Sequence, residues 1–300
     1  MIEHLDQIEE KVLTLGRKFR IAVACAQDSN TIGAVHKAVD KGFAEAILIG
    51  KSSEITSVCK SDSFNKTQYT IVEADNETKA SQEAVRLVKS GDADIVMKGL
   101  VGTDKLLKAV MDKEYGIMIP GAVLSYVAAL EIPAYHKLLF ITDTAVIPFP
   151  DLDQKIAMAK YAIEMAVRFG IMRPKVALIS ASEKMSRHFE NSNDYAIMCK
   201  MADRGQIKDC IMDGPLDLFL ACDKASLSVK NVSTPVDGDA DILLFPSLES
   251  SNPFYKGMML FAHGELAGLL RGTGKPVIVM SRNESEKSKY YSIALSCLMA

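Results

Sequence analysis

The chain has 300 residues, of which 48% are hydrophobic and 24% charged, and its formal net charge at pH 7 is -3. This balance is typical of a globular protein and excludes a disordered or fibrous one. The small negative charge gives no general attraction to nucleic acid or to an anionic membrane, so neither is expected as a partner.

The chain also lacks the usual signs of export or membrane insertion. No apolar run is long enough to span a bilayer, and the acidic start from Met1 to Asp6 lacks the basic-then-apolar order of a signal peptide. The six cysteines are scattered, with no C-x-x-C pair. Reduced thiols in a cytoplasmic protein are therefore expected, and a disulfide framework or zinc site is not.

Apolar runs alternate with helical patterns along the chain. Strands are predicted at 19–25, 46–50, 69–72, 94–97, 176–179, 210–212, 242–245 and 276–280, and further apolar runs lie at 123–130 and 138–141. Helices are predicted at 3–17, 28–39, 77–90, 103–111, 151–169, 195–203, 254–270 and 285–297. Strands that alternate with helices indicate an α/β architecture with a mostly parallel sheet and right-handed crossovers.

Polar residues follow most of the predicted strands at the point where each strand ends. Taken in chain order, they are Lys98, Asp143, Ser180, Asp213, Ser247 with Asn252, and Ser281 with Arg282. A single ending of this kind is most often a helix cap. A succession of six instead favours a ligand site at the carboxyl edge of the sheet.

Lys98 opens a turn that contains Gly99 and Gly102 and leads into a helix beginning near Thr103. A lysine and two glycines before a helix N-terminus could seat an anion, although the P-loop pattern G-x-x-x-x-G-K-[ST] is absent. The alternative is an ordinary turn with a solvated lysine. Later in the chain, Arg282 offers planar donors that match phosphate or carboxylate, and Ser281 beside it can donate to the same anion.

Other chemistries lack their patterns in this sequence. A G-x-S-x-G motif is absent, G-x-G-x-x-G does not follow the first strand, and the five histidines are dispersed. No metal site is therefore expected. The residues by themselves indicate an anion-binding α/β enzyme.

Several ordered blocks resemble the phosphate acetyl/butyryltransferases. The blocks are 213–216, 238–244, Asn252 with Tyr255 and Lys256, and 275–282. Upstream segments are more similar to the butyryltransferase branch than to the acetyltransferase branch, namely 23–50, 96–99, 142–145 and 183–185. The resemblance covers nearly the whole chain.

The resemblance implies a two-domain α/β fold with mostly parallel sheets, like that of isocitrate/isopropylmalate dehydrogenases. The expected domains are residues 1–134 plus 284–300 and residues 135–283, with the break near Ile132 and Pro133. The active site is expected in the cleft between the domains, and the protein is expected to form a homodimer or a higher homo-oligomer.

The implied reaction moves a short-chain acyl group, butyryl or similar, reversibly between coenzyme A and inorganic phosphate. Acyl-CoA and phosphate are then the substrates, and no separate cofactor is needed. The coenzyme A thiolate attacks an acyl phosphate, so the enzyme must assist thiol deprotonation, stabilise an oxyanion and hold phosphate. In this assignment, Arg282 holds phosphate and Ser281 stabilises the transition state. Substrate-binding roles go to Lys98, Thr103, Ser125, Asp143, Asp213, Asn252 and Lys256.

The sequence departs from the family pattern in three places. Ser247 stands where an acidic residue is usual, and serines 250 and 251 stand where a glycine-containing pair is usual. The region that matches the aspartate proposed as thiol base in acetyltransferases is 285–288 and contains no aspartate, and Glu284 or Glu286 could substitute for it. Two alternatives therefore stay open. One is a catalytically impaired homologue that binds acyl-CoA or acyl phosphate, and the other is a metal- and NAD-dependent hydroxy-acid dehydrogenase on the same fold.

Overall fold

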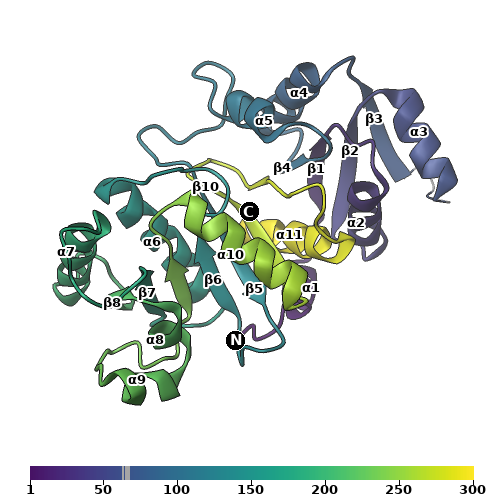
Figure 1. Cartoon of the computed structure of the whole chain (residues 1–300). Helices are drawn as coiled ribbons and strands as arrows, with labels where there is room; N and C mark the ends of the chain where they lie inside the picture. The colour runs from purple at the N-terminus through teal and green to yellow at the C-terminus, as the bar shows by residue number, and fades with distance from the viewer. Residues whose placement is uncertain (63, 65–67) are drawn as a thin grey trace. The chain divides into compact units, whose positions relative to one another are not determined.

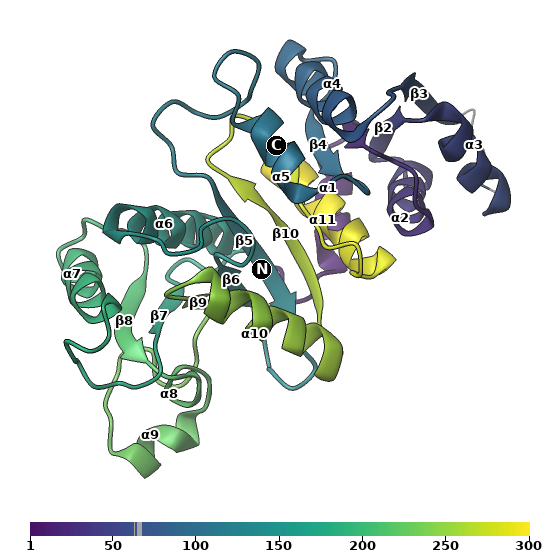
Figure 2. The same ribbon diagram turned by 45° about the horizontal axis from the view of Figure 1, so that its top comes forward.

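The computed structural model describes residues 1–62, 64 and 68–300. The chain divides into two compact units, each built from two segments of the chain (Figures 1 and 2). Unit 1 comprises Met1–His4 and Ser125–Gly264, and unit 2 comprises Leu5–Leu124 and Glu265–Ala300. The structure confirms a mixed α/β fold with mostly parallel strand pairing.

In the described part of unit 2, six strands lie in the order β3-β2-β1-β4-β11-β10. Their bounds are β1 (Phe19–Ala24), β2 (Ala44–Gly50), β3 (Tyr69–Glu73), β4 (Ile95–Lys98), β10 (Glu265–Arg271) and β11 (Val277–Ile278). All neighbours are parallel except β10 and β11, which are antiparallel. Ala24 at the end of β1 pairs with both Ile49 and Lys98, so three strands end at the same edge.

Six helices among the described residues of unit 2 accompany these strands. They are α1 (Gln7–Leu13), α2 (Ser29–Asp40), α3 (Ser52–Ser61), α4 (Glu77–Ser90), α5 (Thr103–Val110) and α11 (Glu286–Met299). Helix α11 packs on β10 and α2, while α4 packs on β1 and α5. Asp28 caps α2 by accepting a hydrogen bond from the Thr31 amide at 2.9 Å, as its position in the sequence predicted.

Unit 1 contains five strands in the order β5-β6-β9-β7-β8. Their bounds are β5 (Ser125–Glu131), β6 (Leu139–Thr142), β7 (Lys175–Ile179), β8 (Ile211–Leu216) and β9 (Ile242–Leu244). Strands β5 and β6 are antiparallel, and the other pairs are parallel. The accompanying helices are α6 (Leu152–Arg168), α7 (Asn191–Asp203), α8 (Leu218–Cys222), α9 (Lys224–Lys230) and α10 (Leu248–Phe261). Asp151 and Gln154 form a capping box at the start of α6.

Each unit has a core of apolar strand residues. Strands β4, β6 and β9 are buried along their whole length, which explains why they occur in the sequence as short continuous apolar runs. Each fully buried valine, leucine or isoleucine stabilises its unit by roughly 1.5–3 kcal/mol relative to an exposed position.

The chain changes unit at three places, which are 4/5, 124/125 and 264/265. The divisions expected from the sequence lie later, at 134/135 and 283/284. Helix α11 belongs to the same unit as β1 to β4.

One predicted element is wrong. The helix expected from about Phe254 to Leu270 is instead α10, which begins at Leu248, followed by strand β10. Ser247 starts the helix early by capping it, and His263, with φ 52°, ends it together with Gly264. The run 266–270 is buried on both faces as a strand, a pattern that periodicity cannot distinguish from a buried helix.

Strand β8 is longer than the sequence indicated. It runs to Leu216 and therefore contains Asp213, which had been expected just beyond the strand. The register between β7 and β8 shifts between Ala177 and Ile179, and this irregularity accommodates Gly214 and Pro215 inside the strand. Helices α3, α8 and α9 lie where no element had been predicted. No helix in the described part of the chain is both long and apolar enough to cross a membrane.

Candidate active site

Three loops meet at the carboxyl edge of the sheet in unit 2. They follow β1, β4 and β11, and backbone hydrogen bonds join the first two, from Gly99 to Ala24 at 2.8 Å and from Leu100 to Cys25 at 2.9 Å. A side chain at Gly99 would place its Cβ 2.2 Å from the Cys25 carbonyl oxygen. Only glycine therefore permits this approach of the two loops.

Lys98 is buried at the end of β4, with 4% of its surface exposed. Its Nζ donates to the carbonyl oxygens of Gly99 and Met280, both at 3.2 Å. Burial lowers the pKa of Lys98, and the nearby positive charges of Arg282 and Lys289 lower it further. The alternative of a solvated turn lysine is therefore wrong.

Ser281 and Arg282 follow β11 after Val279 and Met280. Ser281 is half-buried, and Arg282 is exposed. The Nη2 of Arg282 donates to the Leu100 carbonyl oxygen at 2.7 Å, in the loop after β4. Unit 2 thus brings together Lys98, Ser281 and Arg282, three of the residues that the sequence selected.

Thr103 is the first residue of α5, and the carboxylate of Glu77 lies next to this helix N-terminus. Glu77 Oε2 accepts from the Gly102 amide at 3.3 Å and from Lys105 Nζ at 2.7 Å. The hydrogen bond from Lys105 is the main reason that the pKa of Glu77 is lowered, and Arg282 contributes a smaller electrostatic effect. From the sequence, Glu77 is predicted only as the start of a helix.

Lys289 is a second buried cation beside this edge, with 3% of its surface exposed. Its Nζ lies 3.5 Å from Asp28 Oδ1 and donates to Thr31 Oγ1 at 3.3 Å. Asp28 and Glu284 oppose the depression of the Lys98 pKa, so both carboxylates lie within electrostatic range of the same lysine. Lys289 was not selected from the sequence, since it lies within a helix and its burial depends on the packing of α11 against α2.

In unit 1, Asp143 organises the loop after β6. Its exposed fraction is 2%, and its carboxylate accepts from the amides of Tyr126 at 3.1 Å, Ala145 at 2.8 Å and Val146 at 2.9 Å. Burial raises the pKa of Asp143, and these hydrogen bonds oppose the rise. These hydrogen bonds to the Asp143 carboxylate therefore hold the loop after β6 in place.

The start of α10 is tied to that loop. Ser251 Oγ donates to the Asp143 carbonyl, and Asn252 Nδ2 donates to the Thr144 carbonyl at 2.8 Å. Ser125 is buried at the start of β5, with its Oγ 3.4 Å from Thr142 Oγ1. Unit 1 thus brings together Ser125, Asp143 and Asn252.

Asp213 and Lys256, the other two residues of unit 1 that the sequence selected, do not share the hydrogen bonds of Ser125, Asp143 and Asn252. Asp213 lies within β8, and its Oδ1 accepts from the Gly214 amide at 2.9 Å. Lys256 is exposed on α10, one turn after Asn252 and on the same helix face. The described residues contain no group of three or more His, Cys, Asp or Glu side chains that could hold a metal ion.

Comparison with a family model identifies the family of this chain. The model for phosphate acetyl/butaryl transferase matches residues 65–297. The chain belongs to the phosphate acetyl/butaryl transferase family. A phosphate acetyltransferase from Thermotoga maritima is 34% identical over 296 residues, covering 99% of both chains. A phosphate butyryltransferase from Clostridium acetobutylicum is 40% identical over 300 residues, covering 100% of this chain and 99% of the relative.

A solved structure agrees with this assignment. The branched-chain phosphotransacylase from Enterococcus faecalis V583 has a TM-score of 0.81 and 29% identity, and the match covers 93% of this chain and 98% of that one. The acetyl/butaryl transferase resemblance found in the sequence is thus confirmed.

Within this transferase, two of the unusual serines have a local structural explanation. Ser247 caps α10, since its side chain accepts from the Ser250 amide at 3.3 Å. Ser251 is fully buried and joins α10 to the Asp143 loop. A glycine at position 251 could not donate this side-chain hydrogen bond.

Proposed function

We propose that this phosphate acyltransferase moves a short-chain acyl group, butyryl or one of similar size, reversibly between coenzyme A and inorganic phosphate. Two phosphate butyryltransferases are 40% and 38% identical to the chain, compared with 34% for the Thermotoga phosphate acetyltransferase. This ranking supports an acyl group larger than acetyl. Coenzyme A enters as a substrate, and no separate cofactor is proposed.

The proposed mechanism rests on two hydrogen bonds, one from Lys98 and one from Arg282, each of which ends on a backbone carbonyl near the other residue. The two loops that bear them are held by hydrogen bonds in both directions, which fixes Ser281 next to two cations. Donors that are preorganised in this way stabilise developing negative charge without reorganisation during the reaction. We assign phosphate binding to Arg282, and stabilisation of the anion to Lys98 and Thr103.

In the proposed direct transfer, the thiolate sulfur of coenzyme A attacks the carbonyl carbon of acyl phosphate. A carbon–sulfur bond forms, negative charge develops on the carbonyl oxygen, and Ser281 donates a hydrogen bond to it. The carbon–oxygen bond to phosphate then breaks, and phosphate departs with the electron pair. If both substrates are held together, no covalent enzyme intermediate is required.

The unit 1 residues are proposed to take part in the same reaction. Asn252 and Lys256 share one face of α10, which supports a joint role in binding substrate. For Ser125 and Asp143 the supporting observation is burial, so their proposed contribution is to hold the 142–145 loop in place. Asp213 is proposed to bind substrate through its second carboxylate oxygen.

We also propose that the two units are the two domains of an isocitrate/isopropylmalate dehydrogenase-like fold. Each unit has its own strands, its own helices and its own buried apolar residues, which supports this reading. A cytoplasmic location is proposed on the basis of the six cysteines, all of which are free.

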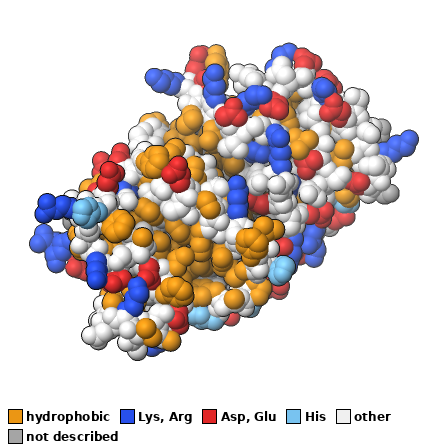
Figure 3. All heavy atoms as spheres, in the orientation of Figure 1, with side chains coloured by type: hydrophobic (Ala, Val, Ile, Leu, Met, Phe, Trp, Pro, Cys, Tyr) orange, Lys and Arg blue, Asp and Glu red, His pale blue; other side chains and the backbone are white. Residues whose placement is uncertain are grey.

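A homodimer is proposed as the assembled form. Helix α10 leaves apolar residues at its end exposed, with Leu260 at 69% and Phe261 at 79%, and Figure 3 shows hydrophobic side chains gathered over this helix. Contiguous apolar surface of this kind commonly marks a protein interface. A second copy of the chain is the proposed partner for this surface.

An acyl-transfer assay with phosphate and a series of acetyl-, propionyl-, butyryl- and branched acyl-CoA donors tests the proposed function. We expect acyl phosphate to form, with the highest kcat/KM for butyryl-CoA or a donor of similar size. Binding of acyl-CoA by calorimetry without formation of acyl phosphate would instead identify an impaired homologue.

A further inference from the structure

Glu265, the first residue of β10, lies at the edge of unit 2 where Ser281 follows β11. Strands β10 and β11 are antiparallel, with Leu270 opposite Val277. The path from Leu270 back to Glu265 therefore follows the direction in which β11 leads to Ser281. A turn closed by a hydrogen bond of 3.3 Å from the Glu284 amide to the Ser281 carbonyl oxygen then leads into α11. Glu265 and Ser281 thus lie on either side of the start of this helix.

Two serines of α11 orient the Glu265 carboxylate. Ser285 Oγ donates to Glu265 Oε2 at 2.6 Å, and Ser288 Oγ donates to the same oxygen. Ser288 Oγ also accepts from the Leu266 amide at 3.0 Å, so its own proton is left for the carboxylate. The segment 285–288 contains no aspartate, yet its serines hold a carboxylate from a neighbouring strand.

The second oxygen of this carboxylate is available. Within the described part of the chain, Glu265 Oε1 has no hydrogen bond, and the carboxylate has no ion pair. Glu265 is half-buried, so a substrate can reach Oε1. A carboxylate with one oriented oxygen and one open oxygen is suited to accept a proton from a bound substrate.

The charged side chains at the start of α11 have other partners. Glu286 packs against α2, where a Cβ added at Gly33 would lie 2.4 Å from its Oε2. Lys287 lies over the tyrosine ring one turn further along α11, and Lys289 Nζ is 3.5 Å from Asp28 Oδ1. Neither lysine therefore neutralises Glu265.

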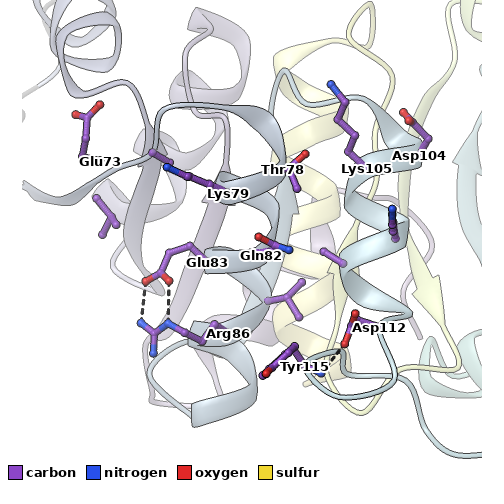
Figure 4. Close-up of a pocket in the computed structure, with 15 residues that line it drawn as sticks. Glu73, Thr78, Lys79, Gln82, Glu83, Arg86, Asp104, Lys105, Asp112 and Tyr115 are labelled. Carbon is purple, nitrogen blue, oxygen red and sulfur yellow. Dashed lines mark hydrogen bonds and ion pairs between the residues drawn. The ribbon is translucent and has the colours of Figure 1, made fainter.

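Other carboxylates of unit 2 are less suited to accept a substrate proton. Glu284 is 8% exposed and lies within electrostatic range of the buried Lys98. In a groove between α4 and α5, Glu83 accepts two hydrogen bonds from Arg86, and Asp112 accepts from two backbone amides (Figure 4). These carboxylates are therefore buried or already paired.

We propose that Glu265 is the general base that removes the thiol proton of coenzyme A, an inference that rests on the proposed function. Oε1 accepts the proton from sulfur while the bond between sulfur and the acyl carbon forms. The carbon–oxygen bond to phosphate breaks, and phosphate departs with the electron pair. The proton then passes from Glu265 to the departed phosphate, which regenerates the carboxylate. Ser285 and Ser288 are positioning residues for this base.

The pH dependence of butyryl-CoA formation from butyryl phosphate and coenzyme A tests this role. A free thiol such as that of cysteine has a pKa of about 8.5, so little thiolate forms unaided at about pH 6.5. In Glu265→Gln, kcat/KM should fall about 100-fold or more at that pH. The deficit should shrink below about tenfold near pH 9, where thiolate is abundant without a base. Glu45→Gln, at an exposed position of β2, should match the wild type at both pH values.

Two further measurements separate a base from a structural or binding residue. Glu265→Asp keeps a carboxylate and should retain more activity than Glu265→Gln at about pH 6.5. Calorimetry should show that Glu265→Gln binds coenzyme A within about threefold of the wild-type affinity. Loss of this binding, or a deficit of the same size at both pH values, would overturn the proposal. A loss of activity in Glu286→Gln that Glu265→Gln does not share would also overturn it.

The same assay distinguishes this proposal from the proposed function. A wild-type protein that prefers acetyl phosphate would contradict the proposed acyl size, and a pH-dependent deficit of Glu265→Gln with that donor would still support the base. Wild-type kcat/KM in Glu265→Gln, in a protein that forms butyryl-CoA, would overturn the base alone. A wild-type protein that transfers no acyl group from any acyl phosphate would contradict both.

Discussion

Lys98 and Arg282 each donate a hydrogen bond to a backbone carbonyl in the loop that carries the other. Lys98 Nζ reaches the Met280 oxygen at 3.2 Å, and Arg282 Nη2 reaches the Leu100 oxygen at 2.7 Å. Each bond joins residues 182 positions apart in the chain. Ser281 lies between Met280 and Arg282, so both bonds restrict the backbone on either side of it.

Removing the Lys98 ammonium should therefore disturb catalysis more than folding. Lys98→Met keeps the length of the side chain but loses the bond to Met280 and one cation. We expect kcat/KM to fall about tenfold or more, because a preorganised donor near the developing charge is lost. The urea unfolding free energy should change by only about 1–2 kcal/mol.

Lys60→Met, at an exposed position of α3, serves as the control and should retain wild-type kinetics. Wild-type kcat/KM in Lys98→Met would contradict a role for this lysine in stabilising the anion.

Gly99→Ala should destabilise unit 2. The added Cβ would lie 2.2 Å from the Cys25 carbonyl oxygen, so the loops after β1 and β4 would have to separate. We expect a loss of about 1–3 kcal/mol in the free energy of unfolding, measured by urea denaturation.

Gly257 offers the matched comparison. It lies inside α10, and an added Cβ would meet nothing within 4 Å. Gly257→Ala should stabilise the protein by up to about 1 kcal/mol through helix propensity. Equal effects from both alanine variants would refute the steric account of Gly99.

Asp239 should make part of the stability of unit 1 dependent on pH. Partial burial raises its pKa, but Lys137 and Lys175, each 2.9 Å away, outweigh this effect and lower the pKa to about 2. The unfolded value is about 3.9. The contribution is therefore complete above pH ~4 and is lost as the pH falls through about 2.

Asp239→Asn tests this dependence. At pH 7 the variant should be less stable than the wild type by about 1 kcal/mol, a value reduced for the partial exposure of the carboxylate. The difference should shrink as urea denaturation is repeated between pH 5 and the lowest pH at which the protein folds. Asp203→Asn, at an exposed residue of α7, should show little difference at any pH. A constant deficit in Asp239→Asn would argue against the assigned ion pairs.

The exposed end of α10 should mediate self-association. The double variant Leu260→Glu, Phe261→Lys replaces apolar surface with charge and should convert the proposed dimer into single chains of 32.7 kDa. Sedimentation measurements would reveal the change. Val229→Glu, on the exposed face of α9, should leave the wild-type mass intact. A single-chain mass for the wild type would rule out the dimer.

Local sequence signals were sufficient for much of the fold. The caps Asp28 and Asp151 and the alternation of apolar runs with helices located most elements. Strand β10 was missed because its apolar run fits a buried helix equally well, and only pairing with β11 decides between the two. The sequence alone also cannot distinguish a buried Lys98 from a solvated turn lysine, because the burial of this side chain depends on tertiary packing.

The candidate site shows the same limit. Ser281 and Arg282 stand out because a serine and an arginine directly follow an apolar strand. Glu77 does not stand out, because its contact with Gly102 joins the starts of two different helices. Ser251 looked like a departure from the family pattern, and its reason is a tertiary hydrogen bond to the Asp143 carbonyl.

The most direct test of the central claim is the initial rate of butyryl phosphate formation from butyryl-CoA and phosphate by purified Ser281→Ala and Arg282→Ala. Both variants should fold, since Arg282 is exposed and Ser281 is half-buried. We expect kcat to fall at least about tenfold in each, with an additional rise in the KM for phosphate in Arg282→Ala. Near-wild-type kcat in both variants would contradict the assignment of the reaction to these two residues.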